Sequence, residues 1–316
     1  MIWSCLLVVV MAAEGEVVPS NEALRPGDFR REVTYNGLNR NYLVHVPKSY
    51  DPAKPMPVVL ILHGGGSNAA MTVRYTGLNE KADQSGFLAV YPNGTGRLAR
   101  ALTWNAGNCC GYAQRQQIDD VGFVGAVLDD LQKAGKVNPR RIYATGISNG
   151  GMLAYRLAVE LPHRIAAIAP VAGTLGIDEV KPSRPVSVIH FHGSEDRFVP
   201  LKGGRGIKSL TQTNFHSVEN TIETWAKLNG CPESPQVSKV PHVGRDEMQV
   251  TRKEYSPGKA GTEVVFYLIE GGGHTWPGRE PMIGIDFLGP TSHDISANDL
   301  MWDFFVKHPL PEKGRP

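Results

Sequence analysis

Short apolar runs, each ending near glycine, proline or asparagine, recur along the chain with helical patterns between them. A run that is apolar at every position suits a central strand buried on both faces. Alternation of such strands with helices predicts a mainly parallel sheet that is covered by helices on both faces. The predicted strands lie in "PVVLILHGGG", "GFLAVYPNG", "RIYATGIS", "IAAIAPVAG", "VSVIHFHG" and "VVFYLIEGGG".

The predicted helices have apolar residues at helical spacing and polar residues suited to helix starts. They span residues 119–135, 149–162, 217–230 and 296–309. Before them, Arg30 to Pro47 alternates apolar and polar residues around Asn36-Gly37, which predicts an antiparallel hairpin. We therefore expect a single α/β domain over residues 25–316.

Composition limits the classes of function. With 316 residues, 41 % hydrophobic and 20 % charged, the chain is typical of a globular protein. A net charge of +2 without a run of five basic residues argues against a nucleic-acid partner. No cysteine or histidine spacing matches a zinc motif, so we expect neither metal nor cofactor. A monomer or weak oligomer is expected.

The N-terminal segment "MIWSCLLVVVMAA" is too short to span a bilayer but has the length of a signal-peptide core. Ala12 and Ala13 suit a cleavage site, although no Lys or Arg precedes Arg25. Residues 1–13 are thus predicted to be a signal peptide of a secreted or periplasmic protein. The alternative is a frayed apolar terminus.

Three cysteines lie beyond this segment, namely Cys109, Cys110 and Cys231. The adjacent pair could form a vicinal disulfide, or one of its members could bridge to Cys231. Three buried thiols are the remaining alternative, because a free cysteine packs as a small hydrophobe.

Ser148 is the candidate nucleophile. It is the central residue of the G-x-S-x-G motif Gly146-Ile147-Ser148-Asn149-Gly150, which follows a predicted strand and opens a predicted helix. So sharp a turn leaves no room for side chains two residues to either side, which explains both glycines. A plain glycine-rich loop is the alternative.

His63-Gly64-Gly65-Gly66 ends the first of the buried strands. Glycines let backbone N–H groups approach an oxyanion that develops during acyl transfer. We expect Gly65, with possible help from Gly66, to supply one donor and the Asn149 amide to supply the other. His63 is expected to form structural hydrogen bonds, and a simple strand-to-loop turn is the alternative.

Asp196 and His274 complete a candidate triad with Ser148. Asp196 lies in "HFHGSEDRFVP" just after a predicted strand, where an orienting carboxylate is required, and it is favoured over Glu195 and Asp178. His274 lies in "EGGGHTWPG" after the last predicted strand, as a general base should. The order Ser, Asp, His along the chain is that of α/β-hydrolases.

On these motifs the chain resembles the secreted α/β-hydrolase esterases of the polyhydroxybutyrate-depolymerase-like and feruloyl-esterase-like family. The resemblance runs from about Arg31 to Leu310 and rests on "LHGGGSN", "WNAGNCCGYA", "DDVGF", "GISNGGM", "HGSEDRFVP", "WAKLNGC" and "GGGHTWPG". It implies the triad roles of Ser148, Asp196 and His274. Members of the family cleave hydroxycinnamoyl esters on xylan, acetyl esters or polyhydroxyalkanoates.

The surroundings of the triad suggest how a substrate binds. Trp104 lies in a loop on the same sheet edge as the nucleophile, and Trp276 lies beside the histidine. Both are expected to form aromatic walls for an acyl group, with loop packing as the alternative. About a dozen residues separate the strands near Gly173 and Val186, so we expect no inserted lid domain and an open, shallow site.

The sequence therefore predicts a secreted serine ester hydrolase that acts through an acyl-enzyme. Feruloyl or acetyl esters of plant cell-wall polysaccharide are the expected substrates, and a polyhydroxyalkanoate or other polyester is the alternative within the class. An acyltransferase on the same triad and a non-catalytic carbohydrate-binding module are the rivals from other classes.

Overall fold

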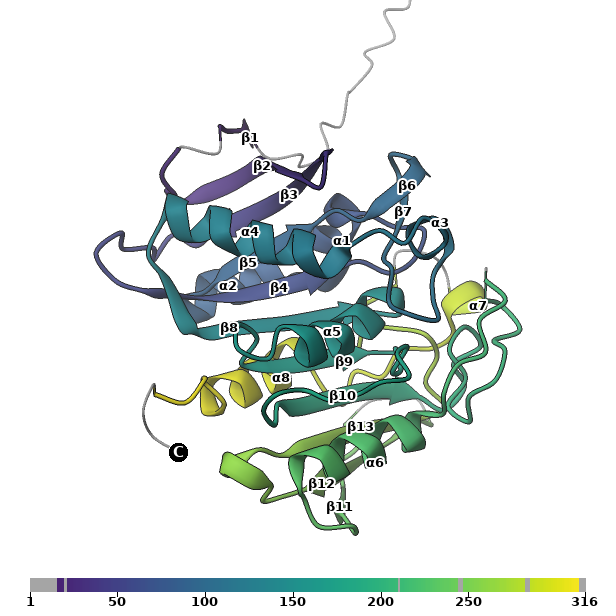
Figure 1. Ribbon diagram of the computed structural model, residues 1–316. Coiled ribbons are helices and arrows are strands. Elements are labelled where there is room, and N and C mark those ends of the chain that lie inside the picture. The colour runs from purple at the N-terminus through teal and green to yellow at the C-terminus, as the bar shows by residue number, and fades with distance from the viewer. Residues whose placement is uncertain (1–15, 20–21, 210, 244–246, 282–284, 313–316) are drawn as a thin grey trace, which may run out of the picture.

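A computed structural model describes residues 16–19, 22–209, 211–243, 247–281 and 285–312, so the predicted signal peptide lies outside the described residues. One large sheet has the strand order β1-β2-β3-β5-β4-β8-β9-β10-β13-β12-β11 (Figure 1). Its strands are β1 (Glu16–Val17), β2 (Gly27–Tyr35), β3 (Leu38–Val46), β4 (Met56–Leu62), β5 (Leu88–Pro92), β8 (Val137–Ile147), β9 (Ala167–Val171), β10 (Ser187–Gly193), β11 (Gln236–Lys239), β12 (Gln249–Tyr255) and β13 (Val264–Glu270).

The middle of the sheet is parallel, from β5 through β4, β8, β9 and β10 to β13. These six strands contain the predicted apolar runs, and nearly all their side chains are buried. The predicted hairpin is confirmed as the antiparallel pair β2–β3. Asn36 and Gly37 have φ of 47° and 75°, which is the backbone that a tight hairpin turn requires.

Helices cover both faces of the sheet, as the sequence predicts (Figure 1). Three of them, α4, α5 and α6, pack on one face, while α1, α2 and α8 pack on the other. Their bounds are α1 (Ala69–Thr76), α2 (Leu78–Ser85), α4 (Asp120–Ala134), α5 (Asn149–Glu160), α6 (Val218–Asn229) and α8 (Ala297–Lys307). Each face therefore has its own apolar core, which suits an α/β-hydrolase fold.

The predicted helix boundaries have a visible cause. Ser217 and Ser296 are N-caps whose side chains accept the amides of Asn220 and Asp299 at 3.0 and 3.2 Å. Gly230 ends α6 in the left-handed conformation, with φ of 67°. These caps set where the helices begin and end, and thereby which residues remain in the loops.

The loops at the carboxyl ends of the parallel strands lie together at one end of the molecule (Figure 1). The sequence did not predict the small elements there, which are β6 (Thr95–Leu98), β7 (Ala101–Thr103), α3 (Gly111–Arg115) and α7 (Ile285–Leu288). Between β9 and β10 the chain forms neither helix nor strand, so no lid domain is inserted at that point. This end of the sheet is where the candidate site residues gather.

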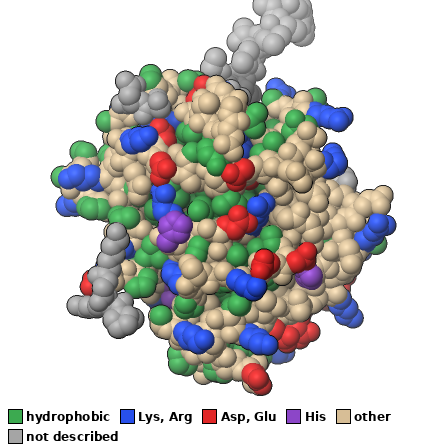
Figure 2. Space-filling view, viewed as in Figure 1, with side chains coloured by type: hydrophobic (Ala, Val, Ile, Leu, Met, Phe, Trp, Pro, Cys, Tyr) green, Lys and Arg blue, Asp and Glu red, His purple; other side chains and the backbone are tan. Residues whose placement is uncertain are grey.

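Among the described helices, none is both long and apolar enough to cross a membrane. On the face drawn in Figure 2, Lys and Arg are interspersed with Asp and Glu. That face thus has no extended field of one sign, as the net charge of +2 leads one to expect.

Candidate active site

Ser148 lies on a strained turn between β8 and α5. Its φ of 58° and ψ of −124° are rare for a residue with a side chain, and such strain is typical of functional positions. A Cβ on Gly150 would lie 2.2 Å from the Leu62 carbonyl oxygen, and one on Gly146 would lie 2.6 Å from the same atom. The turn therefore packs against the end of β4, and only glycine fits on either side of Ser148.

Two backbone amides near Ser148 have no hydrogen-bond acceptor in the described structure. Within the described part of the chain, neither the Gly65 N–H nor the Asn149 N–H has an acceptor. The Gly66 N–H, in contrast, already donates to the Leu102 carbonyl at 2.8 Å. The predicted pair of donors is therefore available, whereas the predicted help from Gly66 is not.

The side chain of Asn149 has a second role that the sequence did not reveal. Its Oδ1 accepts the Trp104 amide at 2.8 Å, and its Nδ2 donates to the Trp104 carbonyl at 3.0 Å. The side chain is thereby fixed to the loop after β7. This pair of hydrogen bonds holds the start of α5 against that loop.

His274 pairs with Asp196, as predicted. His274 Nδ1 lies 2.7 Å from Asp196 Oδ2, and both residues are buried. The other carboxylate oxygen accepts the amides of Phe198 and Val199 at 2.8 and 2.9 Å. Glu195, the adjacent alternative, is exposed instead.

The Asp196 carboxylate is held in its ionised form. Burial by itself raises the pKa of Asp196, but the charge and hydrogen bond of His274, together with His192 and the Val199 amide, bring it below its ordinary value. An ionised carboxylate at Nδ1 keeps a proton on that nitrogen. The opposite nitrogen of His274, Nε2, is then able to take a proton from a nucleophile.

Ser148, His274, Gly65 and Asn149 open on one cavity of about 760 Å³. The Phe198 ring lies 4.9 Å from the His274 ring at a tilt of 30°, and the Phe287 ring lies 5.2 Å from Phe198, measured between ring centroids. Other apolar lining is supplied by Met71, Tyr75, Met152, Phe215 and Leu288, and polar lining by Asn108, Gln114, Arg115, Ser209, Thr211, Gln212 and Thr213. The cavity is bordered by the loops after β10 and β13, and its volume is in the range of small-molecule binding sites.

Trp104 and Trp276 do not form the predicted aromatic walls. Both indoles are fully buried, and neither is among the described residues that line the cavity. Trp104 donates to the His63 carbonyl at 2.9 Å, and Trp276 donates to Asn298 at 2.9 Å. The alternative of loop packing holds for both, because an indole N–H needs a buried partner.

His63 has the structural role that the sequence predicts. Its Nδ1 donates to the Gly64 carbonyl at 2.8 Å, and its Nε2 accepts the Gly94 amide at 3.0 Å. Burial lowers the pKa of His63 to about 4, so the ring is neutral. It ties the turn after β4 to the end of β5.

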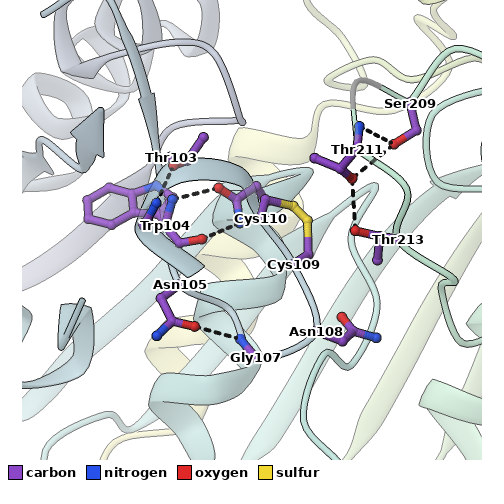
Figure 3. The surroundings of a disulfide bond; sticks show 12 residues. Thr103, Trp104, Asn105, Gly107, Asn108, Cys109, Cys110, Ser209, Thr211 and Thr213 are labelled. Atoms are coloured by element: carbon purple, nitrogen blue, oxygen red, sulfur yellow. Dashed lines mark hydrogen bonds between the residues drawn. A yellow bond between two sulfur atoms is a disulfide. The ribbon is translucent and has the colours of Figure 1, made fainter. Parts of the chain in front are cut away.

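A disulfide joins Cys109 to Cys110 and lines the cavity (Figure 3). Across from it lie Thr211 and Thr213, whose hydroxyls are 2.8 Å apart. Cys231 is half-buried and has a free thiol. Of the pairings left open by the sequence, the structure thus contains the vicinal one.

In the described ranges, no three His, Cys, Asp or Glu side chains are grouped as metal ligands. The polar groups next to Ser148 are instead its own hydroxyl, the His274 imidazole paired with a carboxylate, and two backbone amides without acceptors. This set of groups suits nucleophilic acyl transfer.

Comparison with known proteins agrees with this chemistry. Residues 41–194 match the family model described as "Esterase PHB depolymerase". The putative esterase NocK of Nocardia uniformis subsp. tsuyamanensis is 32 % identical over 287 residues, covering 87 % of this chain and 82 % of the relative. Feruloyl esterase C of Emericella nidulans is 28 % identical over 311 residues, covering 95 % and 98 %.

Among solved structures, acetyl xylan esterase from Aspergillus awamori superposes with a TM-score of 0.57 at 15 % identity, over 87 % of this chain and 99 % of that chain. That likeness concerns the fold. Fold, site and relatives define a carboxylic ester hydrolase of the α/β-hydrolase class. The chain belongs to the PHB-depolymerase-type esterase family.

Proposed function

We propose that Ser148, His274 and Asp196 are the catalytic triad of this ester hydrolase. The main observation in favour is that a strained serine lines the same cavity as the histidine of a buried His–Asp pair. His274 takes the Ser148 hydroxyl proton while Oγ bonds to the acyl carbon, and the proton then passes to the departing alcohol. Water attacks the acyl-enzyme in the same manner and releases the acid.

The amides of Gly65 and Asn149 bind the oxyanion in both halves of this reaction. They are proposed for this because both border the cavity and neither has another acceptor in the described structure. Donors that are already in place need no reorganisation as charge develops on the carbonyl oxygen. Removal of one such donor typically slows turnover by about a hundredfold or more.

Feruloyl or acetyl esters of plant cell-wall polysaccharide are the proposed substrates. Relatives named feruloyl esterase and acetylxylan esterase support this proposal. The cavity supports it as well, because Phe198 and Phe287 offer an aromatic surface beside His274. Hydroxyl and amide groups, such as those of Thr211 and Gln114, suit a sugar. We further propose that the protein is secreted or periplasmic, because sugar polymers of this kind are extracellular. We also propose that it is a monomer or a weak oligomer.

A polyhydroxyalkanoate ester is the second candidate substrate. The observation that favours it is the matched family model, whose description names a PHB depolymerase. Methyl ferulate, acetylated xylan and hydroxybutyrate oligomers, assayed side by side, discriminate the candidates. A value of kcat/KM at least about tenfold higher on one of them identifies the class.

Ser148→Ala tests the triad directly. The variant should lose release of nitrophenol from 4-nitrophenyl acetate by about a thousandfold or more, because the covalent step is removed. Circular dichroism and Tm should match the wild type, since an alanine fits wherever the serine does. Turnover by the variant at the wild-type rate would refute the proposed nucleophile.

A further inference from the structure

A row of buried polar side chains leads from the protein interior to Asp196. Tyr155 of α5 and His190 and His192 of β10 have at most 1 % of their surface exposed. Tyr155 Oη lies 2.9 Å from His190 Nδ1, and His190 Nε2 lies 3.2 Å from His192 Nδ1. Polar groups this deep in a core are tolerated only when they are hydrogen-bonded to one another. The triad mechanism itself uses none of the three.

The last acceptor of the row sets the direction of every hydrogen bond in it. His192 Nε2 lies 2.8 Å from the Val199 carbonyl oxygen, which can only accept, so that nitrogen bears a proton. Burial, the largest influence on both rings, lowers the pKa of His190 and His192, so each is neutral. His192 Nδ1 must then accept from His190 Nε2–H, and His190 Nδ1 must accept from the Tyr155 hydroxyl. Both rings are thereby held in one tautomer.

The His192 N–H points at the turn that carries the triad carboxylate. Besides the Val199 carbonyl, it lies 3.5 Å from Asp196 Oδ2, the oxygen that bonds His274. The Val199 amide in turn donates to Asp196 Oδ1 at 2.9 Å. Val199 thus links His192 to the carboxylate, and the N–H dipole of His192 faces the negative charge.

We propose that His192 is a positioning residue for the Asp196–His274 pair, in the tautomer that the Val199 carbonyl sets and that His190 and Tyr155 support. The inference rests on the proposed catalytic function of that pair. His192 is not among the described residues that line the cavity, so it does not contact an ester bound there. Its loss should therefore lower kcat and leave KM unchanged, because only the alignment of the base is affected.

The test compares two amides that differ by one methylene. In His192→Gln the side-chain N–H can reach the place of Nε2 and donate to Val199, whereas in His192→Asn it is too short to do so. With 4-nitrophenyl acetate we expect His192→Asn to lower kcat about tenfold or more at unchanged KM, and His192→Gln to keep kcat within about threefold of wild type. Equal kcat values for the two variants, whatever their Tm, would overturn the proposal.

Tyr155→Phe removes only the hydroxyl that is hydrogen-bonded to His190. This variant is the second test, in case His192→Asn does not fold. A loss in kcat of about threefold at unchanged KM is expected, because the buried His190 Nδ1 then lacks its donor and the row holds His192 less firmly. A wild-type kcat in Tyr155→Phe would overturn the role of the row. Wild-type protein without esterase activity would instead refute the proposed function. Failure of the positioning role and failure of the proposed function are therefore distinguishable.

Discussion

Glycines around Ser148 show how single residues decide whether this site exists. Gly146 and Gly150 are required because the backbone of the turn contacts the Leu62 carbonyl. Gly173 is constrained in the same way, since a Cβ there would lie 2.6 Å from the Ser148 carbonyl oxygen. The nucleophile is thus held by close backbone contacts rather than by side chains.

Gly150→Ala should unfold the turn or displace it. Its Cβ would meet two carbonyl oxygens, those of Leu62 and His63, at 2.2 and 2.6 Å. Backbone cannot yield as a flexible side chain does, so we expect a loss of about 3 kcal/mol in the free energy of unfolding, together with loss of esterase activity. Urea denaturation and the nitrophenyl ester assay measure the two effects.

Gly125→Ala is the matched control for this variant. Gly125 lies within α4, and a Cβ there meets no atom within 4 Å. Alanine is the better helix former by about 0.5–1 kcal/mol, so stability should rise and activity should stay the same. If both alanine variants lost stability equally, the close contacts at Gly150 would not be the cause.

At the scale of elements, a buried ion pair ties β3 and α4 to the loop before α3. Arg40 Nη2 lies 2.7 Å from Asp120 Oδ1, and the Asn105 amide donates to Asp120 Oδ2 at the same distance. The Arg40 guanidinium also lies 3.6 Å from the Phe123 ring centroid. Asp120 lies at the start of the helix predicted over residues 119–135, but its partner Arg40 is 80 residues away along the chain, so no local pattern indicates the pair.

Arg40→Met should destabilise the protein by about 3–5 kcal/mol, because it leaves the Asp120 charge buried and unpaired. Arg25→Met is the control, since Arg25 pairs with Glu16 at the same 2.7 Å but both side chains are at least half exposed. An exposed pair contributes little, so Tm of the control should not change measurably. Similar Tm shifts in both variants would contradict the dependence on burial.

At the scale of the whole molecule, an ion-paired histidine lies in a part of the sheet that is separate from the candidate site. His45 of β3 contacts Asp28 of β2 and Asp83 of α2 at 2.8 and 3.3 Å. In the strand order, β5 and β4 separate β3 from β8, which carries Ser148 at its end. Burial lowers the pKa of His45, but the two carboxylates raise it by more than burial lowers it. The pKa of His45 is therefore above its ordinary value.

This raised pKa predicts a pH-dependent contribution to stability. A group with a raised folded-state pKa stabilises the fold fully below its ordinary value of 6.5, and loses that contribution as pH rises through the folded-state pKa. His45→Gln should therefore be less stable than wild type at pH 5.5–6 and differ less from it near pH 9. Urea denaturation at both pH values measures this, and kcat on a nitrophenyl ester should be unchanged. An equal difference at the two pH values would contradict the ion pairing.

Local patterns explain why so much was predictable. The apolar runs, the Asn36-Gly37 turn and the caps Ser217 and Ser296 each act within a few residues, so the sequence alone determined the α/β-hydrolase fold. The same holds for Ser148, whose motif sits at a strand–helix junction. Parallel strands then place the loops with Asp196 and His274 at the same edge, in the expected chain order.

Burial and pairing over long distances were decided only by tertiary structure. Trp104 and Trp276 are packed within the loops because His63, just after β4, and Asn298 of α8 accept their N–H groups, and no local signal reveals such partners. The cavity is likewise lined by residues from several loops that are far apart in the sequence, such as Gly65, Phe198 and His274. His192 received its role in the same way, because its bond to Val199 exists only once the chain turns back at Asp196. Short-range patterns thus determined which groups do the chemistry, and long-range packing decided how they are held.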